Sequence, residues 1–430
     1  YSMIEYKRFY PEAEATAHML GFTGTDDHGR EGLELSFDKK LAGIEGSKRV
    51  MKDLKGHRVQ DVALLKPARP GQDVILSFDS RVQYSAYREL ARGVAEHNAV
   101  AGVLVSLDVE TGEVLAMASV PSFNPNNRGT LDIDAVRNRA VTDMFEPGST
   151  LKPFTLVAAL ESGKFTTSSH FDTSPGTFRV LNKVVRDHSN YGVIDMQTVL
   201  TKSSNVATAQ IAMALPRDTL PLLHQHLGFG STTGSGFPGE SAGILQPSNR
   251  WNPVEVATMS YGYGVTVTAL QLAQAYATIA SGGIQRPVSF IKVNGPVEGH
   301  RVIPEVIAKS LIPMMETVVT QEGTALRAAV PGYRVAGKTG TAHKAKGGGY
   351  SSDQYMSLFV GMAPASNPKI VTAVIIDTPR KGGYYGGLAA APVFSRSMAD
   401  ALRLMNVEPD RSSERLAGQA RLPYRPAAGG

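Results

Sequence analysis

Two groups of strand-like segments frame the central part of this sequence. Residues 102–109 and 113–118 have the pattern of a β-hairpin, and Gly112 supplies the turn between them. The second group of strand-like runs lies far along the chain, at 333–342, 356–363 and 370–377. Helical spacing of apolar residues predicts helices at 81–96, where Asp79 is the N-cap, and at 152–162, 195–214, 266–281, 304–320 and 391–404. The sequence therefore predicts one α/β domain whose sheet is completed by the C-terminal half of the chain.

The remaining segments suggest a division into three parts. Residues 1–79 are rich in glycine and charge, with strand-like pieces at 59–65 and 73–77 and no catalytic pattern. We expect a non-catalytic segment at 1–79, a catalytic domain at 80–405, and a mobile tail at 406–430, where prolines and a closing Gly-Gly occur.

Composition excludes some classes of site. The 430-residue chain has no cysteine, which removes cysteine nucleophiles, thiolate metal sites and disulfides. His224 and His226 have metal-like spacing but no visible third ligand, so no metal or cofactor is expected. A net charge of +5 without clustered Lys/Arg argues only weakly for nucleic acid, and none is expected as a partner. Apolar runs such as 99–107 are too short to span a membrane, and a sequence beginning at Tyr1 carries no information about a targeting segment.

The first motif that could carry chemistry is Ser149-x-x-Lys152. Pro147 and Gly148 mark a turn before an apolar helix, which places Ser149 at the helix N-terminus and Lys152 on the same face. This arrangement suits a nucleophile and its base, with free backbone N–H groups for an oxyanion. Taken alone, the motif is better explained by an ordinary helix cap followed by a solvated lysine, because Ser-x-x-Lys is common by chance.

Two further motifs follow. Lys202-Ser203-Ser204-Asn205 opens another helix, where a hydroxyl and an amide two residues apart suit proton relay and amide recognition, or simple capping. Val335–Ala342 contains Lys338-Thr339-Gly340-Thr341 inside a predicted strand. Its glycines leave room for a ligand backbone along the strand, or for close approach of a neighbouring segment.

Together the three motifs resemble the signature of penicillin-binding proteins. Short sequence segments around the motifs narrow the resemblance to the septal class B members, the division-specific D,D-transpeptidases of Gram-negative bacteria, over residues 5–405. These segments are Arg8–Pro11, Gly32–Leu35, Phe123–Asn126, Arg137–Arg139, Ser203–Val206, Tyr261–Gly264 and Ala389–Phe394. The resemblance implies an antiparallel sheet flanked by helices, with a smaller N-terminal pedestal.

The resemblance also implies a mechanism. Ser149 would attack the penultimate D-Ala carbonyl of a stem peptide ending in D-Ala-D-Ala, and the amine of a second stem peptide would take the acyl group. Lys152 would be the general base, although keeping a lysine neutral at pH 7 costs about 4.6 kcal/mol. Burial and the charge of Lys338 would lower that cost. Ser203 would move the proton to the leaving amine, and Asn205 would bind the substrate amide.

The binding residues follow from the same resemblance. Thr339 and Thr341, with Gly340 between them, would bind the terminal carboxylate, and the N–H groups of Ser149 and Thr341 would form an oxyanion hole. His343 stands where close relatives often carry arginine. An aromatic wall formed by tyrosines, several of them in glycine-rich segments, is expected to contact substrate and β-lactams, which mimic D-Ala-D-Ala. Its members are Tyr350, Tyr355, Tyr384 and Tyr385, for which the alternative is ordinary exposed loop tyrosines, and Tyr263 is expected to contact the same ligands.

The resemblance further implies a periplasmic location, with an N-terminal membrane helix lying outside this sequence. Divisome membrane proteins, including a lipid II glycan polymerase, would be its partners. Three alternatives share the motifs: a D,D-carboxypeptidase, a β-lactamase and a β-lactam sensor domain. A divisome scaffold with a vestigial site is disfavoured by the complete set of motifs, and no equivalent of the deacylating glutamate of class A β-lactamases is recognisable.

Overall fold

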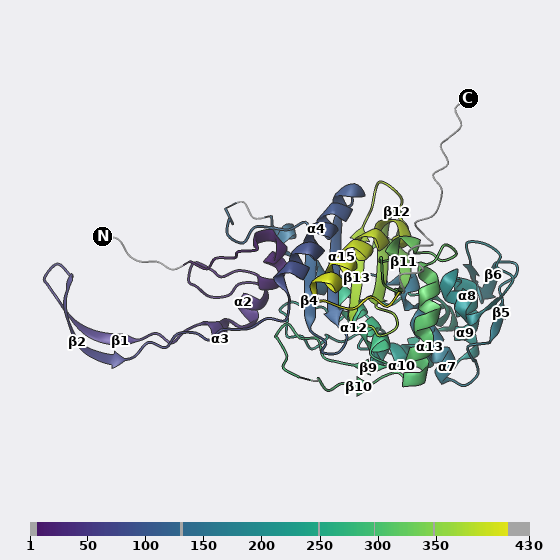
Figure 1. Ribbon diagram of the computed structural model, residues 1–430, viewed down its shortest axis with the longest axis horizontal. Helices are drawn as coiled ribbons and strands as arrows, with labels where there is room; N and C mark the ends of the chain where they lie inside the picture. The colour runs from purple at the N-terminus through teal and green to yellow at the C-terminus, as the bar shows by residue number, and fades with distance from the viewer. Residues whose placement is uncertain (1–6, 130–131, 248–249, 296, 347–348, 412–430) are drawn as a thin grey trace, which may run out of the picture.

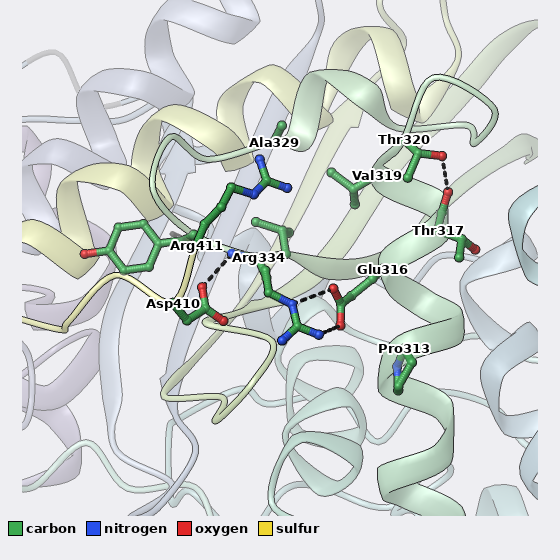
Figure 2. A pocket seen from close by; sticks show the side chains of 11 residues that line it. Pro313, Glu316, Thr317, Val319, Thr320, Ala329, Arg334, Asp410 and Arg411 are labelled. Carbon is green, nitrogen blue, oxygen red and sulfur yellow. Dashed lines mark hydrogen bonds and ion pairs between the residues drawn. The ribbon is translucent and has the colours of Figure 1, made fainter. Parts of the chain in front are cut away.

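The computed structural model describes residues 7–129, 132–247, 250–295, 297–346 and 349–411 (Figure 1). Its centre is a five-stranded antiparallel sheet with the order β11-β12-β13-β3-β4. The strands are β3 (Ala101–Asp108), β4 (Val114–Val120), β11 (Ala336–Lys346), β12 (Gly349–Ala363) and β13 (Ile370–Asp377). Strand β13 pairs with β3 along its whole length, so the two groups of strand-like segments join in one sheet, as the sequence predicts.

Helices cover both faces of this sheet. Helices α4 (Ser80–Glu96) and α15 (Ala391–Leu404) pack together over one face, and α12 (Ala269–Ala280) packs against the other (Figure 1). Asp79 caps α4 by accepting the backbone N–H of Arg81, as expected from the sequence. The contact between α4 and α15 is close because Gly93 has no side chain. A Cβ there would lie 2.3 Å from Cγ2 of Val393.

A helical region packs beside the sheet and leads into strand β11. Its longer helices are α7 (Lys152–Glu161), α8 (Met196–Thr201), α9 (Asn205–Ala214), α10 (Thr219–His226), α11 (Pro253–Met259) and α13 (Glu305–Glu316). Short elements complete it: α5 (Ile133–Val136), α6 (Arg139–Thr142), α14 (Gly386–Ala389), η2 (Gly148–Leu151), η4 (Thr317–Val319), η5 (Leu326–Ala328), β5 (His170–Asp172), β6 (Thr177–Val180), β7 (Lys183–Arg186), β8 (Val193–Asp195), β9 (Ile284–Gln285) and β10 (His300–Arg301). The fully buried face of α7 anchors the turn at Ser149.

The N-terminal region is built differently. It contains η1 (Ala13–Ala15), α1 (Ala17–Leu20), α2 (Gly32–Ser36), α3 (Asp38–Leu41) and the hairpin strands β1 (Ser47–Lys52) and β2 (Arg58–Lys66). The β1–β2 hairpin projects away from the rest of the molecule (Figure 1). Every residue of β2 is exposed, and on β1 only Val50 is even half-buried. No helix of the described residues is long and apolar enough to cross a membrane.

Three sequence predictions differ from the structure. The helix predicted at 195–214 is two helices, because Ser203 adopts a left-handed conformation (φ 59°) between α8 and α9. No strand forms at 73–77, where an isolated bridge joins Leu76 to Ile291. Strand β11 begins at Ala336 rather than at 333, since the backbone N–H of Arg334 donates to the Asp410 side chain.

Candidate active site

The three sequence motifs meet in one cleft of about 680 Å³ beside strand β11. The cleft is lined by Ser149 from η2, by Ser203 and Asn205 at the start of α9, and by Thr339 and Thr341 from β11. The structure therefore brings together residues that lie up to about two hundred positions apart in the sequence.

The turn that carries Ser149 is held by close backbone contacts. Gly148 has φ 55°, and its N–H donates to the Gly262 carbonyl at 3.0 Å. A Cβ on Gly262 would lie only 1.9 Å from the Gly148 carbonyl oxygen, so glycine is required there. The Ser149 side chain is half-buried, and its hydroxyl has no hydrogen-bond partner among the described residues. It thus faces the cleft unengaged.

Two fully buried lysines lie behind the cleft. Lys152 Nζ donates to Ser203 Oγ at 3.1 Å, to Asn205 Oδ1 at 2.7 Å, and to the Ser203 carbonyl. Lys338 Nζ donates to the same Ser203 Oγ at 3.0 Å. The Ser203 hydroxyl therefore stands between two amines, one from helix α7 and one from strand β11.

Burial makes both amines easy to deprotonate. It lowers the pKa of Lys152 well below the usual 10.5, the charge of Lys338 lowers it further, and the carboxylate of Asp187 raises it. Burial alone lowers the pKa of Lys338 to about 7. The sequence analysis expected burial and the charge of Lys338 as the two causes at Lys152, and a pKa of about 7 lets Lys338 exchange a proton near neutral pH.

Asp187 was not singled out from the sequence. Its carboxylate accepts the Ser204 hydroxyl at 2.6 Å and the backbone N–H groups of Asn205 and Val206 at 2.5 and 3.0 Å. The Asn205 side-chain amide in turn donates to the Arg186 carbonyl at 3.0 Å. No motif marks this residue, because it lies eighteen positions before Asn205 and reaches α9 only through the fold.

The threonines of β11 present hydroxyls to the cleft. Thr339 Oγ1 shares a hydrogen bond of 2.6 Å with the Thr324 hydroxyl. Thr341 Oγ1 accepts the Gly386 N–H at 3.1 Å, which leaves its own proton available for a carboxylate. These contacts orient both side chains before any ligand binds.

The glycines of this strand do not leave room for a ligand. A Cβ on Gly340 would lie 2.9 Å from both the Pro147 carbonyl oxygen and Cγ2 of Thr150. A Cβ on Gly337 would lie 2.5 Å from the ring of Phe359. The alternative considered from the sequence, close approach of a neighbouring segment, is correct. Gly340 lets the turn before Ser149 pack directly on the strand.

The expected aromatic wall is present with one difference. Tyr263, Tyr384 and Tyr385 line the cleft, whereas Tyr350 lies outside its lining. Tyr350 belongs to β12, and its hydroxyl donates to Glu146 Oε1 at 3.1 Å. It also packs edge-on against Tyr263 at 5.8 Å.

Tyr355, which the sequence analysis also placed in the wall, lines the cleft as well, and two histidines extend the row of rings. Tyr355 stacks on Tyr384 at 4.0 Å, and His343 packs against Tyr355 at 4.6 Å. At the other end the ring of His188 contacts Tyr385 at 5.9 Å. Lining residues that the sequence analysis did not propose for the site are His188, Tyr191, Thr201, Glu322, Thr324, Gly386, Gly387 and Leu388.

Comparison with known proteins decides the family. Residues 102–399 match the penicillin-binding protein transpeptidase domain, and residues 3–76 match the penicillin-binding protein dimerisation domain. The peptidoglycan D,D-transpeptidase FtsI of Escherichia coli K12 is 44% identical over 406 residues, covering 94% of this chain and 68% of that protein. The chain belongs to the septal class B penicillin-binding proteins.

Other relatives of this penicillin-binding protein agree. A probable peptidoglycan D,D-transpeptidase, PbpC, of Pseudomonas aeruginosa is 42% identical over 409 residues, covering 94% of this chain and 72% of that protein. The apo transpeptidase domain of Burkholderia pseudomallei penicillin-binding protein 3 aligns with a TM-score of 0.73 at 41% identity. That alignment covers 80% of this chain and all of that one.

The two histidines with metal-like spacing lie in different environments in this penicillin-binding protein. His224 is fully buried against the ring of Phe229, and neither ring nitrogen has a hydrogen-bond partner in the described part of the chain. His226 is exposed, and no cluster of potential metal ligands occurs among the described residues. Trp251 is buried and donates to the Gln246 carbonyl at 2.9 Å.

Proposed function

We propose that this chain is a serine-type peptidoglycan D,D-transpeptidase in which Ser149 is the nucleophile. The family assignment gives the reaction class. The observation that supports the residue roles is the position of the Ser203 hydroxyl between the buried amines of Lys152 and Lys338, in the cleft that Ser149 lines. We therefore assign the proton path to Lys152, Ser203 and Lys338, and the nucleophile to the Ser149 hydroxyl of the same cleft.

In the first half-reaction, Ser149 Oγ forms a bond to the penultimate D-Ala carbonyl carbon while Lys152 Nζ takes its proton. The tetrahedral oxyanion collapses, the bond to the last D-Ala nitrogen breaks, and Ser203 relays a proton to that leaving amine. In the second half-reaction, the acceptor amine attacks the ester carbonyl and gives up a proton to the same path. Ser149 leaves as its hydroxyl. A new amide bond cross-links the two stem peptides.

Substrate recognition is assigned to the other wall of the cleft. We assign the terminal carboxylate to the Thr339 and Thr341 hydroxyls, and the substrate amide to Asn205, whose side chain already contacts Lys152. The tyrosines at 263, 384 and 385 line the same cleft and are assigned to substrate and β-lactam contacts. His343 also lines the cleft, and its Nδ1 lies 2.9 Å from the Ser351 carbonyl.

The cellular setting belongs to the same proposal. We assign the protein to the periplasmic face of the inner membrane, working with divisome membrane proteins that include a glycan polymerase using lipid II. We also assign residues 1–79 to a non-catalytic pedestal and 80–405 to the transpeptidase domain. The segment at 406–430 is described only as far as residue 411, so its predicted mobility lies largely outside the described residues.

Intact-mass measurement after exposure to benzylpenicillin tests the nucleophile. We expect one covalent adduct per chain, none with Ser149→Ala, and a normal adduct with Ser162→Ala at the other end of α7. An adduct that survives Ser149→Ala would contradict the assignment.

A second assay separates transfer from hydrolysis. With a thioester analogue of D-Ala-D-Ala as donor and a D-amino acid as acceptor, we expect the aminolysis product. Acid product alone would instead identify a carboxypeptidase. An adduct without any turnover would identify a β-lactam sensor.

A further inference from the structure

Asp187 occupies a position that the reaction scheme above does not use. It follows strand β7, and its backbone N–H donates to the Gly176 carbonyl at 3.0 Å, which closes the base of the β6–β7 hairpin. From there the half-buried carboxylate reaches helix α9. One oxygen accepts the N–H groups of Asn205 and Val206, and the other accepts the Ser204 hydroxyl. A single side chain thus joins the hairpin to the first turn of α9.

The segment that Asp187 holds is conformationally strained. Ser203 adopts φ 59°, a region that non-glycine residues occupy at a cost of about 1–3 kcal/mol unless their surroundings enforce it. The same residue must direct its hydroxyl to Lys152 and Lys338. The contacts of Asp187 begin at the very next residue, Ser204, so they supply the external restraint that this turn needs.

The charge of Asp187 also faces the buried lysine pair. Lys152 and Lys338 share the interior behind the cleft, where burial lowers the pKa of both amines and the charge of Lys338 lowers the pKa of Lys152 further. Asp187 is the negative group that acts on Lys152 in the opposite direction. It also acts with burial to raise the pKa of the neighbouring Tyr191 hydroxyl. Its influence therefore reaches both the base and a residue lining the cleft.

We propose that Asp187 is the positioning residue of this site: it fixes the start of α9 so that Ser203 and Asn205 meet Lys152, and its negative charge acts on Lys152 against the charge of Lys338. This inference rests on the proposed function but concerns a residue outside the three motifs. It predicts two separable effects, one from the hydrogen bonds and one from the negative charge.

The test measures acylation of Ser149 by a fluorescent penicillin from pH 5.5 to 9.5 in three variants. Asp187→Asn keeps an acceptor oxygen and removes the charge, so the pKa of Lys152 falls. Because acylation needs neutral Lys152, the acidic limb of the profile shifts to lower pH by about half a unit. Asp187→Ala removes the restraint as well and lowers the rate about 10- to 100-fold at every pH. Asp187→Glu keeps the charge, and its acidic limb stays at the wild-type pH.

Asp195→Asn is the matched control. Asp195 caps α8 through the Thr198 N–H and is not a charge that acts on Lys152, so its loss changes melting without moving the pH limb. An Asp187→Asn profile that superimposes on wild type overturns the charge role. Near-normal acylation by Asp187→Ala overturns the positioning role. If the alanine variant does not fold, the Asn and Glu variants decide through the pH limb alone. Loss of the penicillin adduct in Ser149→Ala remains an independent test of the proposed function.

Discussion

The cleft and the N-terminal hairpin both depart from the usual distribution, in which charged side chains are exposed and apolar ones are buried. Charged side chains are buried behind the cleft, and apolar side chains are exposed on the hairpin. Behind the cleft, Lys152 and Lys338 are fully buried. On the β1–β2 hairpin and its turn, Leu54, Val59 and Leu64 are exposed at 108%, 63% and 69%. Lysine is almost never fully buried without a partner, whereas exposed apolar residues are unusual only when they gather. Both regions therefore need an explanation beyond folding.

The difference lies in how the two anomalies are compensated. The buried amines have partners within the chain, in Ser203, Asn205 and the carbonyls around them. The hairpin residues face solvent on both sides, and no third strand joins the two-stranded sheet among the described residues. The buried amines, which have partners within the chain, point to chemistry inside the molecule. The exposed apolar residues of the hairpin, which have no such partners among the described residues, point to a role of the surface.

The largest expected effect comes from removing one buried amine. Lys152→Met should reduce penicillin acylation by at least about 1000-fold, because the proposed general base is lost. It should leave the melting temperature unchanged or higher, since an apolar side chain of similar volume carries no desolvation cost there. Stopped-flow acylation and a thermal melt measure the two effects. A strongly destabilised variant would mean that the buried amine is structural.

A pH-dependent loss of stability should reveal two buried histidines, His18 on helix α1 and His224 on helix α10. Burial lowers the pKa of His18 and of His224 to about 4, so the unfolded chain, with a pKa near 6.5, binds the proton more readily. Stability is therefore full above pH 6.5 and falls as the pH drops towards 4, by up to about 3 kcal/mol for each histidine.

Urea unfolding at pH 7.5 and 4.5 measures this dependence. His224→Phe should remove about half of it, whereas His226→Gln, at an exposed position two residues later, should leave it unchanged. An unaltered pH dependence in His224→Phe would rule out His224 as its source.

Packing between the nucleophile turn and strand β11 should tolerate no added atom. Gly340→Ala places a methyl group 2.9 Å from the Pro147 carbonyl, which should cost about 1–3 kcal/mol and slow acylation at Ser149. Gly349→Ala is the control on the adjacent strand, because nothing lies within 4 Å of its Cβ. Thermal melts and acylation rates that do not distinguish the two variants would refute this account.

The smallest effect is expected on the hairpin. Leu54→Ser at the exposed turn should change the free energy of unfolding by no more than about 0.5 kcal/mol and leave acylation unchanged. Matched melts would show it. A loss larger than 1 kcal/mol would mean that this side chain has a contact that the isolated chain already makes.

Sequence reasoning reached the sheet and the three motifs because both depend on local patterns. The alternation of apolar residues located β3, β4, β12 and β13, and short sequence motifs located Ser149, Ser203 and Lys338. It missed what depends on contacts between distant segments. The left-handed Ser203 splits a predicted helix, Asp187 arrives from a separate hairpin, and Gly340 meets the turn at Pro147 rather than a ligand. Tyr350 was likewise expected in the cleft, but its hydroxyl donates a hydrogen bond to Glu146.

The pairing of β13 with β3 has a consequence for how the protein is made. Sheet contacts between residues near 101–108 and 370–377 close a very long loop, and such contacts form late and slowly. During synthesis, residue 149 is added to the chain long before the residues of strand 336–346, which pack beside it in the folded protein. Any fragment ending before residue 336 therefore contains Ser149, the proposed nucleophile, without Lys338, so the proposed site cannot assemble until strand β11 has been synthesised.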